Sequence, residues 1–476
     1  MRVLKFGGSS LDGPERLANV AELVCQARES GRIVVVVSAL AGVTDALEAA
    51  IERAVAGDPA TPLVERLATR HLECLASPQA DEAHRDTEDQ LAAALQRLRR
   101  LLEGIRLVGE CPCSTRDQIL ATGERLSAPL VNWHLRRQGR AAQVIDGSRL
   151  IATGPPGRAS VDPAETCRRV ERRLRNVGAD EIPVVTGFIG SDSVGQTTTL
   201  GRGASDFSAT LLAMALGAEE VEIWTDVDGV LSADPRWVPS ASTLPHLTYG
   251  EATDLACYGA RVLHPQTLDP LVRSGIPATI RNSLAPDRSG TRIDAGDPRE
   301  STTRAITAMA RVVRFRLRIP DGSVEPAHLS MFRELDEPPL ISSWETPGRT
   351  LTWVTRAEHS ELTERLARRH GLDVIQREAL ALITILGGPQ VDLPLLRALS
   401  EGSLPFQDLS WSGATSLAKT LLVERSVLRS AVRWLHHALV ENPVDHPPIG
   451  GLFESGSAVE STDAGVPQAH ALSSSS

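Results

Sequence analysis

A lysine directly precedes a pair of glycines near the start of the chain, in the segment Lys5-Phe6-Gly7-Gly8-Ser9-Ser10. Glycines in a turn between a strand and a helix let backbone N–H groups approach an anion, and the helix N-terminus adds partial positive charge. This segment is therefore a candidate binding site for the phosphates of a nucleotide. It is not a P-loop, because there the lysine follows the glycines.

Lys5 is also unusual for its residue type. The chain carries 50 basic residues, and only Lys5 and Lys419 are lysines, so arginine supplies nearly all of the positive charge. The two side chains differ, since lysine offers a compact ammonium group and arginine a planar fork of donors. Retention of a lysine at position 5 therefore indicates a site that needs an ammonium group.

The pattern around Lys5 predicts the elements that would position it. Residues 2–6 indicate a short strand and residues 14–27 a helix with one apolar face. Residues 33–37 form a continuous β-branched run, typical of a strand covered by helices on both faces. A helical block is predicted over residues 44–108, and further strands are predicted at residues 142–145, 183–186, 220–225 and 277–281. This alternation predicts an α/β fold with a mostly parallel central sheet over residues 1–295.

A different pattern follows a predicted linker that begins near residue 293. The order β-α-β-β-α-β occurs over residues 308–378, beginning with a strand at 311–319, and again over residues 379–445, beginning with a strand at 379–386. Two ferredoxin-like βαββαβ modules are therefore expected, in tandem or interleaved. Residues 446–476 are rich in Pro, Gly and Ser and are predicted to be disordered.

Composition excludes several classes of function. A chain of 476 residues with 42% hydrophobic and 23% charged residues predicts several folded cores. The longest apolar run, residues 33–43, is too short for a membrane span and lies too far into the chain for a signal peptide, so we expect a cytoplasmic protein. A net charge of −10 disfavours nucleic acid and membrane surfaces as partners. The six cysteines lack the spacing of zinc or redox sites and are expected to be reduced, and no metal site made of protein ligands is predicted.

The segment of residues 5–10 resembles the opening motif of the aspartate kinases, members of the amino-acid kinase superfamily. These enzymes transfer a phosphoryl group from ATP to a carboxylate. Other segments are similar to motifs of the same family in the same order: residues 37–44, 123–127, 199–206, 224–236 and 259–265. The resemblance covers the whole of the first domain and implies the αβα sandwich of that superfamily.

The resemblance also implies roles for individual residues. The implied ATP-binding residues are Lys5, Phe6, Gly7, Gly8, Ser9, Thr225, Asp226, Val230, Leu231, Arg236 and Arg261. The implied substrate-binding residues are Ser38, Thr44, Glu124, Phe188, Arg202, Ser205 and Asp206. Lys5, Asp206 and Arg261 are the implied catalytic residues. In the family, Glu124 would bind the substrate ammonium group and Arg202 its carboxylate.

Three positions depart from the family pattern. Asp45 stands where Asn is common, Ala204 where Gly is usual and Arg261 where Lys is usual. A chain that has replaced almost every lysine can accept arginine where only charge near a phosphate is needed. Retention of lysine at position 5 then marks Lys5 as the less replaceable of the two cations. His264, before a proline, is interpreted as structural rather than as a base.

The residue types permit a mechanism without a general base. A carboxylate nucleophile is already ionised at neutral pH, so catalysis consists of alignment and charge neutralisation. Lys5, Arg261 and a divalent cation must offset the repulsion between substrate and triphosphate. Mg²⁺ is expected, with its oxygen ligands largely from phosphate. A free amino acid needs an anion for its ammonium group and a bidentate cation for its carboxylate, which Glu124 and Arg202 would provide. The resemblance implies 4-phospho-L-aspartate as the product, on the route to lysine, threonine and methionine.

The two C-terminal modules resemble ACT domains, which bind amino acids at paired interfaces. An amino-acid effector near the loops at residues 319–322 and 386–389 is one expectation, and dimerisation alone is the other. A homodimer or homotetramer is expected in either case. The kinase half is similar to that of the bifunctional aspartate kinase and homoserine dehydrogenase, but a monofunctional enzyme is expected because no glycine-rich dinucleotide-binding unit follows.

Two other functions stay open from the sequence. One is a kinase that acts on glutamate or an acylated amino acid, against which the Glu124 and Arg202 motifs count. The other is a non-catalytic amino-acid sensor derived from a kinase, which the three departures suggest. Retention of Lys5, Arg202, Asp206 and Asp226 counts against a sensor.

Overall fold

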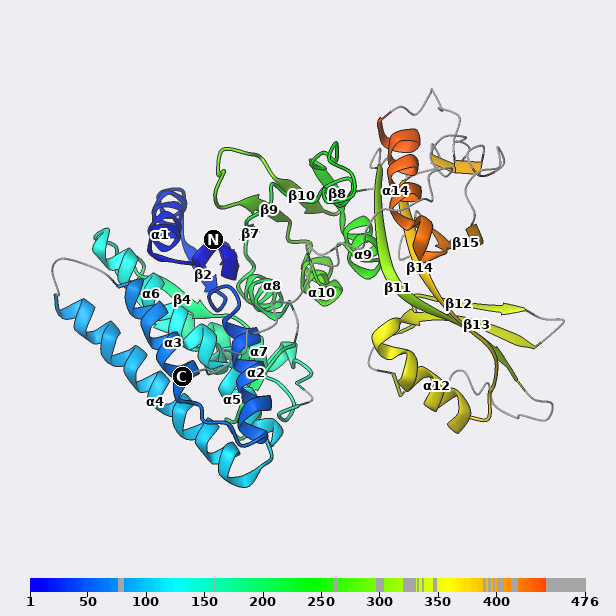
Figure 1. The fold of residues 1–476 in the computed structure, drawn as a ribbon. Coiled ribbons are helices and arrows are strands. Elements are labelled where there is room, and N and C mark those ends of the chain that lie inside the picture. The colour runs from blue at the N-terminus through cyan, green and yellow to red at the C-terminus, as the bar shows by residue number, and fades with distance from the viewer. Residues whose placement is uncertain are drawn as a thin grey trace, which may run out of the picture.

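The computed structural model describes residues 1–75, 81–157, 159–201, 203–260, 263–296, 304–319, 338–345, 349–387, 406–411 and 418–441, with a few residues at 331–335 and 391–399. An N-terminal half built on a mostly parallel sheet adjoins a C-terminal half built on an antiparallel sheet (Figure 1). In the described part of the chain, no helix has the length and apolar character needed to span a bilayer.

The N-terminal sheet has eight strands in the order β3-β4-β2-β1-β7-β9-β10-β8. In that order the strands are β3 (Ala142–Ile145), β4 (Ile182–Thr186), β2 (Ile33–Val37), β1 (Arg2–Phe6), β7 (Glu220–Thr225), β9 (Ala278–Asn282), β10 (Thr291–Asp294) and β8 (His246–Thr248). Strand β1 lies near the centre and pairs in parallel with β2 and β7. β10 runs antiparallel to β9, and the other neighbouring pairs are parallel. The predicted α/β class with a mostly parallel sheet is confirmed.

Helices cover both faces of this sheet because its central strands are apolar on both sides. In β2, Ile33, Val35 and Val37 face one buried cluster, and Val34 and Val36 face the other. The cluster on the first face is completed by α1 (Pro14–Glu29), α2 (Val43–Val55), α3 (Thr61–Glu73), α4 (Glu82–Val108), α5 (Cys113–Leu120) and α6 (Thr122–Arg137), of which α3 and α4 pack on other helices. The second is covered by α7 (Pro163–Leu174), α8 (Ala204–Leu216), α9 (Tyr249–Cys257) and α10 (Pro265–Ser274). A short hairpin, β5 (Ile189–Ser191) and β6 (Thr197–Thr199), was not predicted.

The C-terminal half is one antiparallel sheet of six strands in the order β12-β13-β11-β14-β16-β15. These are β12 (Ile341–Glu345), β13 (Thr350–Arg356), β11 (Arg304–Arg318), β14 (Asp373–Gly387), β16 (Ala418–Val423) and β15 (Phe406–Trp411). β11 and β14 have 15 residues each and pair along their whole length. Helix α12 (Ser360–Arg369) packs against the end of the sheet formed by β13, and α14 (Leu428–His436) against the end formed by β16.

The two expected modules are therefore interleaved in one sheet. The strand predicted to begin at residue 311 begins at Arg304, and the division predicted at residues 378 and 379 falls inside β14. β14 alternates between exposed and half-buried residues in its first half and is fully buried in its second half, so one strand has the pattern of two. The helices predicted at 324–335 and 393–400 lie mostly outside the described residues, and the predicted tail at 446–476 lies wholly outside them.

Candidate active site

The glycine turn that follows β1 is held between two neighbouring strands. The Gly7 N–H donates to the Trp224 carbonyl at 3.0 Å, and the Phe6 ring stacks on Trp224 with centroids 6.1 Å apart. Gly8 begins a 3₁₀ turn (Gly8–Leu11), where a Cβ atom would lie 2.6 Å from the Ala39 carbonyl oxygen. Only glycine fits at position 8, because this contact is to backbone. The turn therefore lies directly against the loop that follows β2.

Lys5 forms an ion pair with Asp206 beneath this turn. Its Nζ atom lies 2.6 Å from Asp206 Oδ1, and the two side chains are 10% and 13% exposed. At this distance the Lys5 ammonium is the partner of Asp206 Oδ1. A Cβ atom at Gly7 would lie 3.4 Å from the same Nζ. The structure thus brings together the ammonium group, the glycine turn and the first turn of α8, which carries Asp206.

Glu124 lies in the first turn of α6 and is almost fully buried. One carboxylate oxygen accepts a hydrogen bond from the Ala39 N–H at 3.1 Å, and the other, Oε2, has no partner in the described part of the chain. Burial raises the pKa of the Glu124 carboxyl to about 8, against smaller opposing effects of the Ala39 N–H and of the Arg125 and Lys5 charges. Buried polar atoms are rarely left unpaired, so Oε2 marks a place for a donor that a ligand would bring.

The loop after β2 is hydrogen-bonded to the end of β1 and to helix α6. The Ser38 N–H donates to the Phe6 carbonyl at 3.2 Å, and the Ser127 hydroxyl donates to the Ser38 carbonyl at 2.6 Å. A Cβ atom at Gly123 would lie 2.6 Å from the Ala39 Cβ, so α6 packs closely on the loop. Thr44 follows in the first turn of α2 and is half-buried.

The loop after β4 is fastened to the N-terminal turn of α8. A Cβ atom at Gly187 would lie 2.8 Å from the Ser205 Cβ, and the Phe188 N–H donates to the Ser208 hydroxyl at 2.9 Å. Phe188 has a φ of 66°, which is unusual for a residue with a side chain and is often found at functional sites. The structure therefore places Phe188 and Ser205 beside the helix turn that carries Asp206.

The segment of residues 224–236, which we call the nucleotide stretch because the family resemblance implies contacts with ATP there, begins at the end of β7. The Thr225 hydroxyl donates to Asp226 at 3.2 Å, and Asp226 is exposed. Val230 is buried in the core, and its N–H donates to the Thr291 hydroxyl at 2.8 Å. Leu231 forms an isolated bridge to residue 243. Val230 and Leu231 thus have structural contacts that shape the backbone of this stretch.

Arg236 lies further along the nucleotide stretch on an exposed turn, where its guanidinium pairs with Asp234 at 2.6 Å. Arg202 and Arg261, predicted to bind the substrate carboxylate and the phosphates, lie outside the described residues. Ala39 and Ser127 were not predicted as site residues. The contribution of Ala39 is a backbone N–H, which no residue type reveals, whereas Ser127 already lay within a family-like segment.

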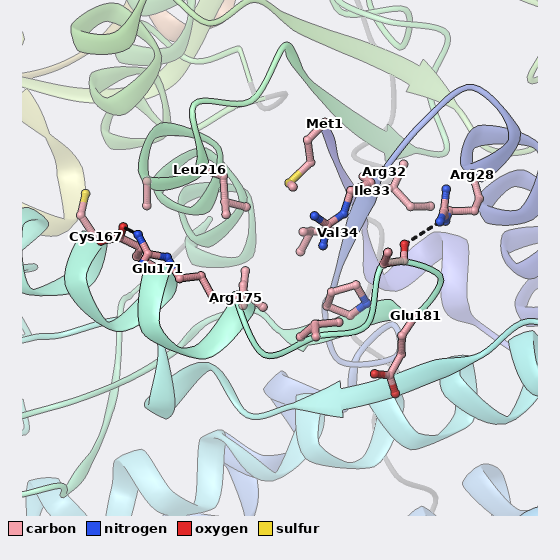
Figure 2. A pocket seen from close by; sticks show the side chains of 15 residues that line it. Met1, Arg28, Arg32, Ile33, Val34, Cys167, Glu171, Arg175, Glu181 and Leu216 are labelled. Carbon is pink, nitrogen blue, oxygen red and sulfur yellow. Dashed lines mark hydrogen bonds and ion pairs between the residues drawn. The ribbon is translucent and has the colours of Figure 1, made fainter.

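A cavity of about 370 Å³ lies at the opposite edge of the N-terminal sheet (Figure 2). Its lining includes Met1, Ile33 and Pro183 at the beginnings of β1, β2 and β4, with Leu174 and Leu216 at the ends of α7 and α8. Ligands of open α/β sheets bind at the carboxyl ends of the strands, where Lys5 and the glycine turn lie. This cavity is therefore not the candidate active site.

Comparison with known proteins identifies the family of this chain. Residues 1–282 match the family model described as the amino acid kinase family. Aspartokinase 3, chloroplastic, of Arabidopsis thaliana is 31% identical over 468 residues, which cover 92% of this chain and 81% of that protein. The bifunctional aspartokinase/homoserine dehydrogenase of Haemophilus influenzae is 34% identical over 325 residues, which cover 67% of this chain and 40% of that protein. The chain thus spans less than half the length of the bifunctional relatives that it matches.

Solved structures of aspartokinases share the fold of this chain. E. coli aspartokinase III in complex with aspartate and ADP (R-state) matches with a TM-score of 0.78 at 24% identity, covering 92% of this chain and 99% of that chain. The same enzyme in complex with lysine and aspartate (T-state) matches with a TM-score of 0.71 at 26% identity and the same coverage. The chain belongs to the amino acid kinase family and, within it, to the aspartokinases.

Proposed function

We propose that this chain is an ATP-dependent aspartate kinase that converts ATP and L-aspartate into ADP and 4-phospho-L-aspartate. The observation that carries the proposal is the Lys5 ammonium, buried against Asp206 beneath a glycine turn and near a glutamate with an unpaired oxygen. The turn and the lysine suit a triphosphate, and the glutamate suits the ammonium group of an amino acid. The aspartokinase relatives support aspartate as that amino acid.

Glu124 would select a substrate with a free ammonium group. Its Oε2 atom is buried without a partner in the described structure, and a substrate ammonium would supply both the missing donor and a compensating charge. An N-acylated amino acid lacks that charge. Arg202 would bind the α-carboxylate, as the family resemblance implies. Ser38, Thr44, Phe188 and Ser205 are proposed to line the substrate.

Phosphoryl transfer would need no proton acceptor. The β-carboxylate of aspartate is ionised at neutral pH, and one of its oxygens forms a bond to the γ-phosphorus. The bond between that phosphorus and the β,γ-bridging oxygen breaks, and its electron pair leaves on ADP. Lys5 would neutralise negative charge on the transferring group, and Asp206 would hold the Lys5 ammonium in place. Arg261 is proposed as a second cation at the phosphates.

The residues present fit a Mg²⁺ ion carried mainly by the nucleotide. Within the described ranges, no three acidic, histidine or cysteine side chains are grouped as a metal site. Mg²⁺ commonly takes one or two carboxylates and completes its shell with phosphate oxygens and water. Asp206, which lies beside the Lys5 ammonium in the first turn of α8, is the carboxylate proposed to hold it. When bound, Mg²⁺ would neutralise charge on the β- and γ-phosphates.

The rest of the ATP site is proposed from the turn and the nucleotide stretch. Phe6, Gly7, Gly8 and Ser9 would surround the phosphates from one side. Thr225 and Asp226 would contact the nucleoside end, with Val230 and Leu231 shaping the backbone and Arg236 reaching the phosphates. These roles follow the family resemblance, and the positions of Thr225 and Asp226 at the carboxyl end of β7 support them.

We further propose an amino-acid effector for the C-terminal modules and assembly as a homodimer or homotetramer. The aspartokinase III structure with lysine supports the effector. A cytoplasmic location is proposed as well, because all six cysteines, each of them in the described ranges, are free.

The test is an assay with purified protein, ATP, Mg²⁺ and hydroxylamine, which traps an acyl phosphate as a hydroxamate. Hydroxamate that forms with L-aspartate, and not with L-glutamate or N-acetyl-aspartate, is the expected result. Product from glutamate but not aspartate would show that the substrate assignment is wrong. No product from any of them, together with specific aspartate binding, would favour the sensor. Repeating the assay with lysine, threonine and methionine, singly and in pairs, identifies an effector.

A further inference from the structure

The segment that carries Arg236 forms a closed arm between β7 and β8. We call residues 230–243 the nucleotide arm. The arm is closed at its base, where the Leu244 N–H donates to the Val230 carbonyl and the Ser232 N–H donates to the Ser242 carbonyl, both at 2.8 Å. Arg236 lies at the turn of the arm, away from this base.

Apart from Val230, which lies in the core of the N-terminal half, four apolar residues of the nucleotide arm pack into the C-terminal half of the molecule. Ala233 and Val238 belong to the cluster formed by β14, β16 and α14, and Trp237 and Ala241 pack against that cluster. Two hydrogen bonds to carbonyl oxygens of the arm add to this packing. The Ile306 N–H of β11 donates to the Ser232 carbonyl at 2.7 Å, and Arg433 Nε of α14 donates to the Trp237 carbonyl at 2.6 Å. The arm therefore belongs to the kinase half by sequence and to the C-terminal core by packing.

A polar network with a buried centre, Ser232 and His436, and an exposed end joins the arm to the end of α14. Ser232 Oγ lies 2.9 Å from His436 Nε2, and His436 Nδ1 lies 2.9 Å from Glu441 Oε1, in the π-helical turn (His437–Glu441) that follows α14. The Ser240 hydroxyl donates to the same Glu441 oxygen, so the network returns to the arm. His437 contacts the other Glu441 oxygen at 3.0 Å. Ser232 and His436 are each only 1% exposed.

The chemistry of the partners assigns the protons in this network. A carboxylate only accepts, so His436 Nδ1 carries the proton and donates to Glu441. Burial lowers the pKa of His436, so the ring is neutral near pH 7 and Nε2 accepts from the Ser232 hydroxyl. The Ser232 oxygen in turn accepts from the Ser242 N–H at 3.0 Å. Ser232 is not a candidate nucleophile, because burial at 1% exposure leaves no access for a substrate.

We propose that His436 is a positioning residue for the ATP site, holding the nucleotide arm and thereby Arg236 from the C-terminal half. The proposal rests on the proposed kinase function, in which Arg236 contacts the phosphates. A displacement of α14 would break the Ser232 contact and move the arm, so ATP affinity would follow the position of this helix. Aspartate, bound near Glu124 on the other side of β1, would not be affected.

The test compares His436→Leu and Ser232→Ala with His370→Leu in the full chain. His370 lies 2.9 Å from Glu334, so its pairing with a carboxylate is similar, but that pair lies beyond α12 and away from the arm. We expect both arm variants to weaken ATP binding about tenfold by calorimetry without aspartate, with the KM for aspartate changed less than about twofold. The double variant should lose no more ATP affinity than the single variant that binds ATP more weakly, because both substitutions break the same contact between Ser232 and His436.

Hydrogen exchange provides a readout that does not depend on catalysis. Amides of residues 230–243 should exchange faster in both arm variants and at the wild-type rate in His370→Leu. If His436→Leu does not fold, Ser232→Ala, which removes only a hydroxyl, decides the question. Wild-type ATP affinity in the folded arm variants, or an equal loss in His370→Leu, would overturn the inference. Failure of the kinase proposal is seen separately, as absence of aspartyl hydroxamate from a wild-type protein that still binds ATP.

Discussion

Replacement of Glu124 by glutamine isolates the charge that is proposed to bind the substrate ammonium. The glutamine carbonyl can still accept from the Ala39 N–H, which Glu124 Oε1 accepts at 3.1 Å. The second oxygen, which has no partner within the described structure, becomes an NH₂ group that can only donate. Glu124→Gln therefore keeps the fold of the site and removes the anion from it.

The expected change in stability follows from the pKa. Burial raises the pKa of Glu124 from 4.5 to about 8, so the folded protein keeps a proton that the unfolded chain has released. The stability contribution of this group is fully present below pH 4.5 and is lost as the pH rises to 8. Each pKa unit corresponds to about 1.4 kcal/mol, so the loss is on the order of 5 kcal/mol for a fully buried group. Glu124→Gln should be more stable than wild type above pH 8, with the difference vanishing below pH 4.5.

The same pKa predicts how aspartate binding depends on pH. With a pKa of about 8, roughly one molecule in ten carries the Glu124 carboxylate at pH 7. If the ammonium needs that carboxylate, the KM for aspartate should fall about fivefold between pH 7 and pH 8 in the wild type. In Glu124→Gln the KM should be at least about tenfold higher and independent of pH, because a charge-assisted hydrogen bond is lost.

Urea unfolding measured from pH 4 to pH 9 tests the first expectation, and initial rates measured from pH 6 to pH 9 test the second. Glu251→Gln is a matched control, since Glu251 is also fully buried but serves the capping box of α9 away from the site. It should leave the KM for aspartate and its pH dependence unchanged. A wild-type KM that does not vary between pH 6 and pH 8, or a glutamine variant with the wild-type KM, would refute the role given to Glu124.

Three further predictions concern the phosphate end of the site. Lys5→Arg should lower kcat by about a hundredfold or more, whereas Arg261→Lys should change kcat less than about threefold. Equal kcat values for the two variants in steady-state assays would contradict the argument from lysine scarcity. Asp206→Asn removes the anion 2.6 Å from the Lys5 ammonium and should raise the Mg²⁺ concentration that gives half-maximal rate, so an unchanged Mg²⁺ titration would count against it. Gly8→Ala should destabilise the protein by about 1–3 kcal/mol in urea, because its Cβ atom would meet backbone. Gly104→Ala, at an open helical position in the described structure, should stabilise it by about 0.5–1 kcal/mol. A change of the same sign in both variants would refute the steric reasoning.

Several elements were predictable because their signals are local. The strands at residues 2–6, 33–37, 142–145 and 220–225 were predicted with the bounds of β1, β2, β3 and β7. Helix α1 begins at Pro14, as its proline at the first turn predicts. Short strands such as β8 and β10 were missed, because three or four residues carry too little periodicity.

The C-terminal half shows where local patterns mislead. β14 was predicted as two strands because exposed residues alternate with half-buried ones in its first half, whereas every residue of its second half is buried. That difference arises from what packs on the strand: α14 and its cluster cover the second half. Interleaving of the modules follows from pairing between β11 and β14, which are far apart in the sequence.

Local sequence was enough to predict the glycine turn after β1, the rare lysine beside it and the alternation of strands and helices that makes an α/β fold. These depend on residue types and on spacings of a few positions. Only the folded arrangement shows that the Lys5 ammonium contacts Asp206, that one Glu124 oxygen has no partner among the described residues and that His436 contacts Ser232. The two contacts join segments that lie far apart in the sequence, and they exist only because α8 packs against β1 and the nucleotide arm packs into the second core.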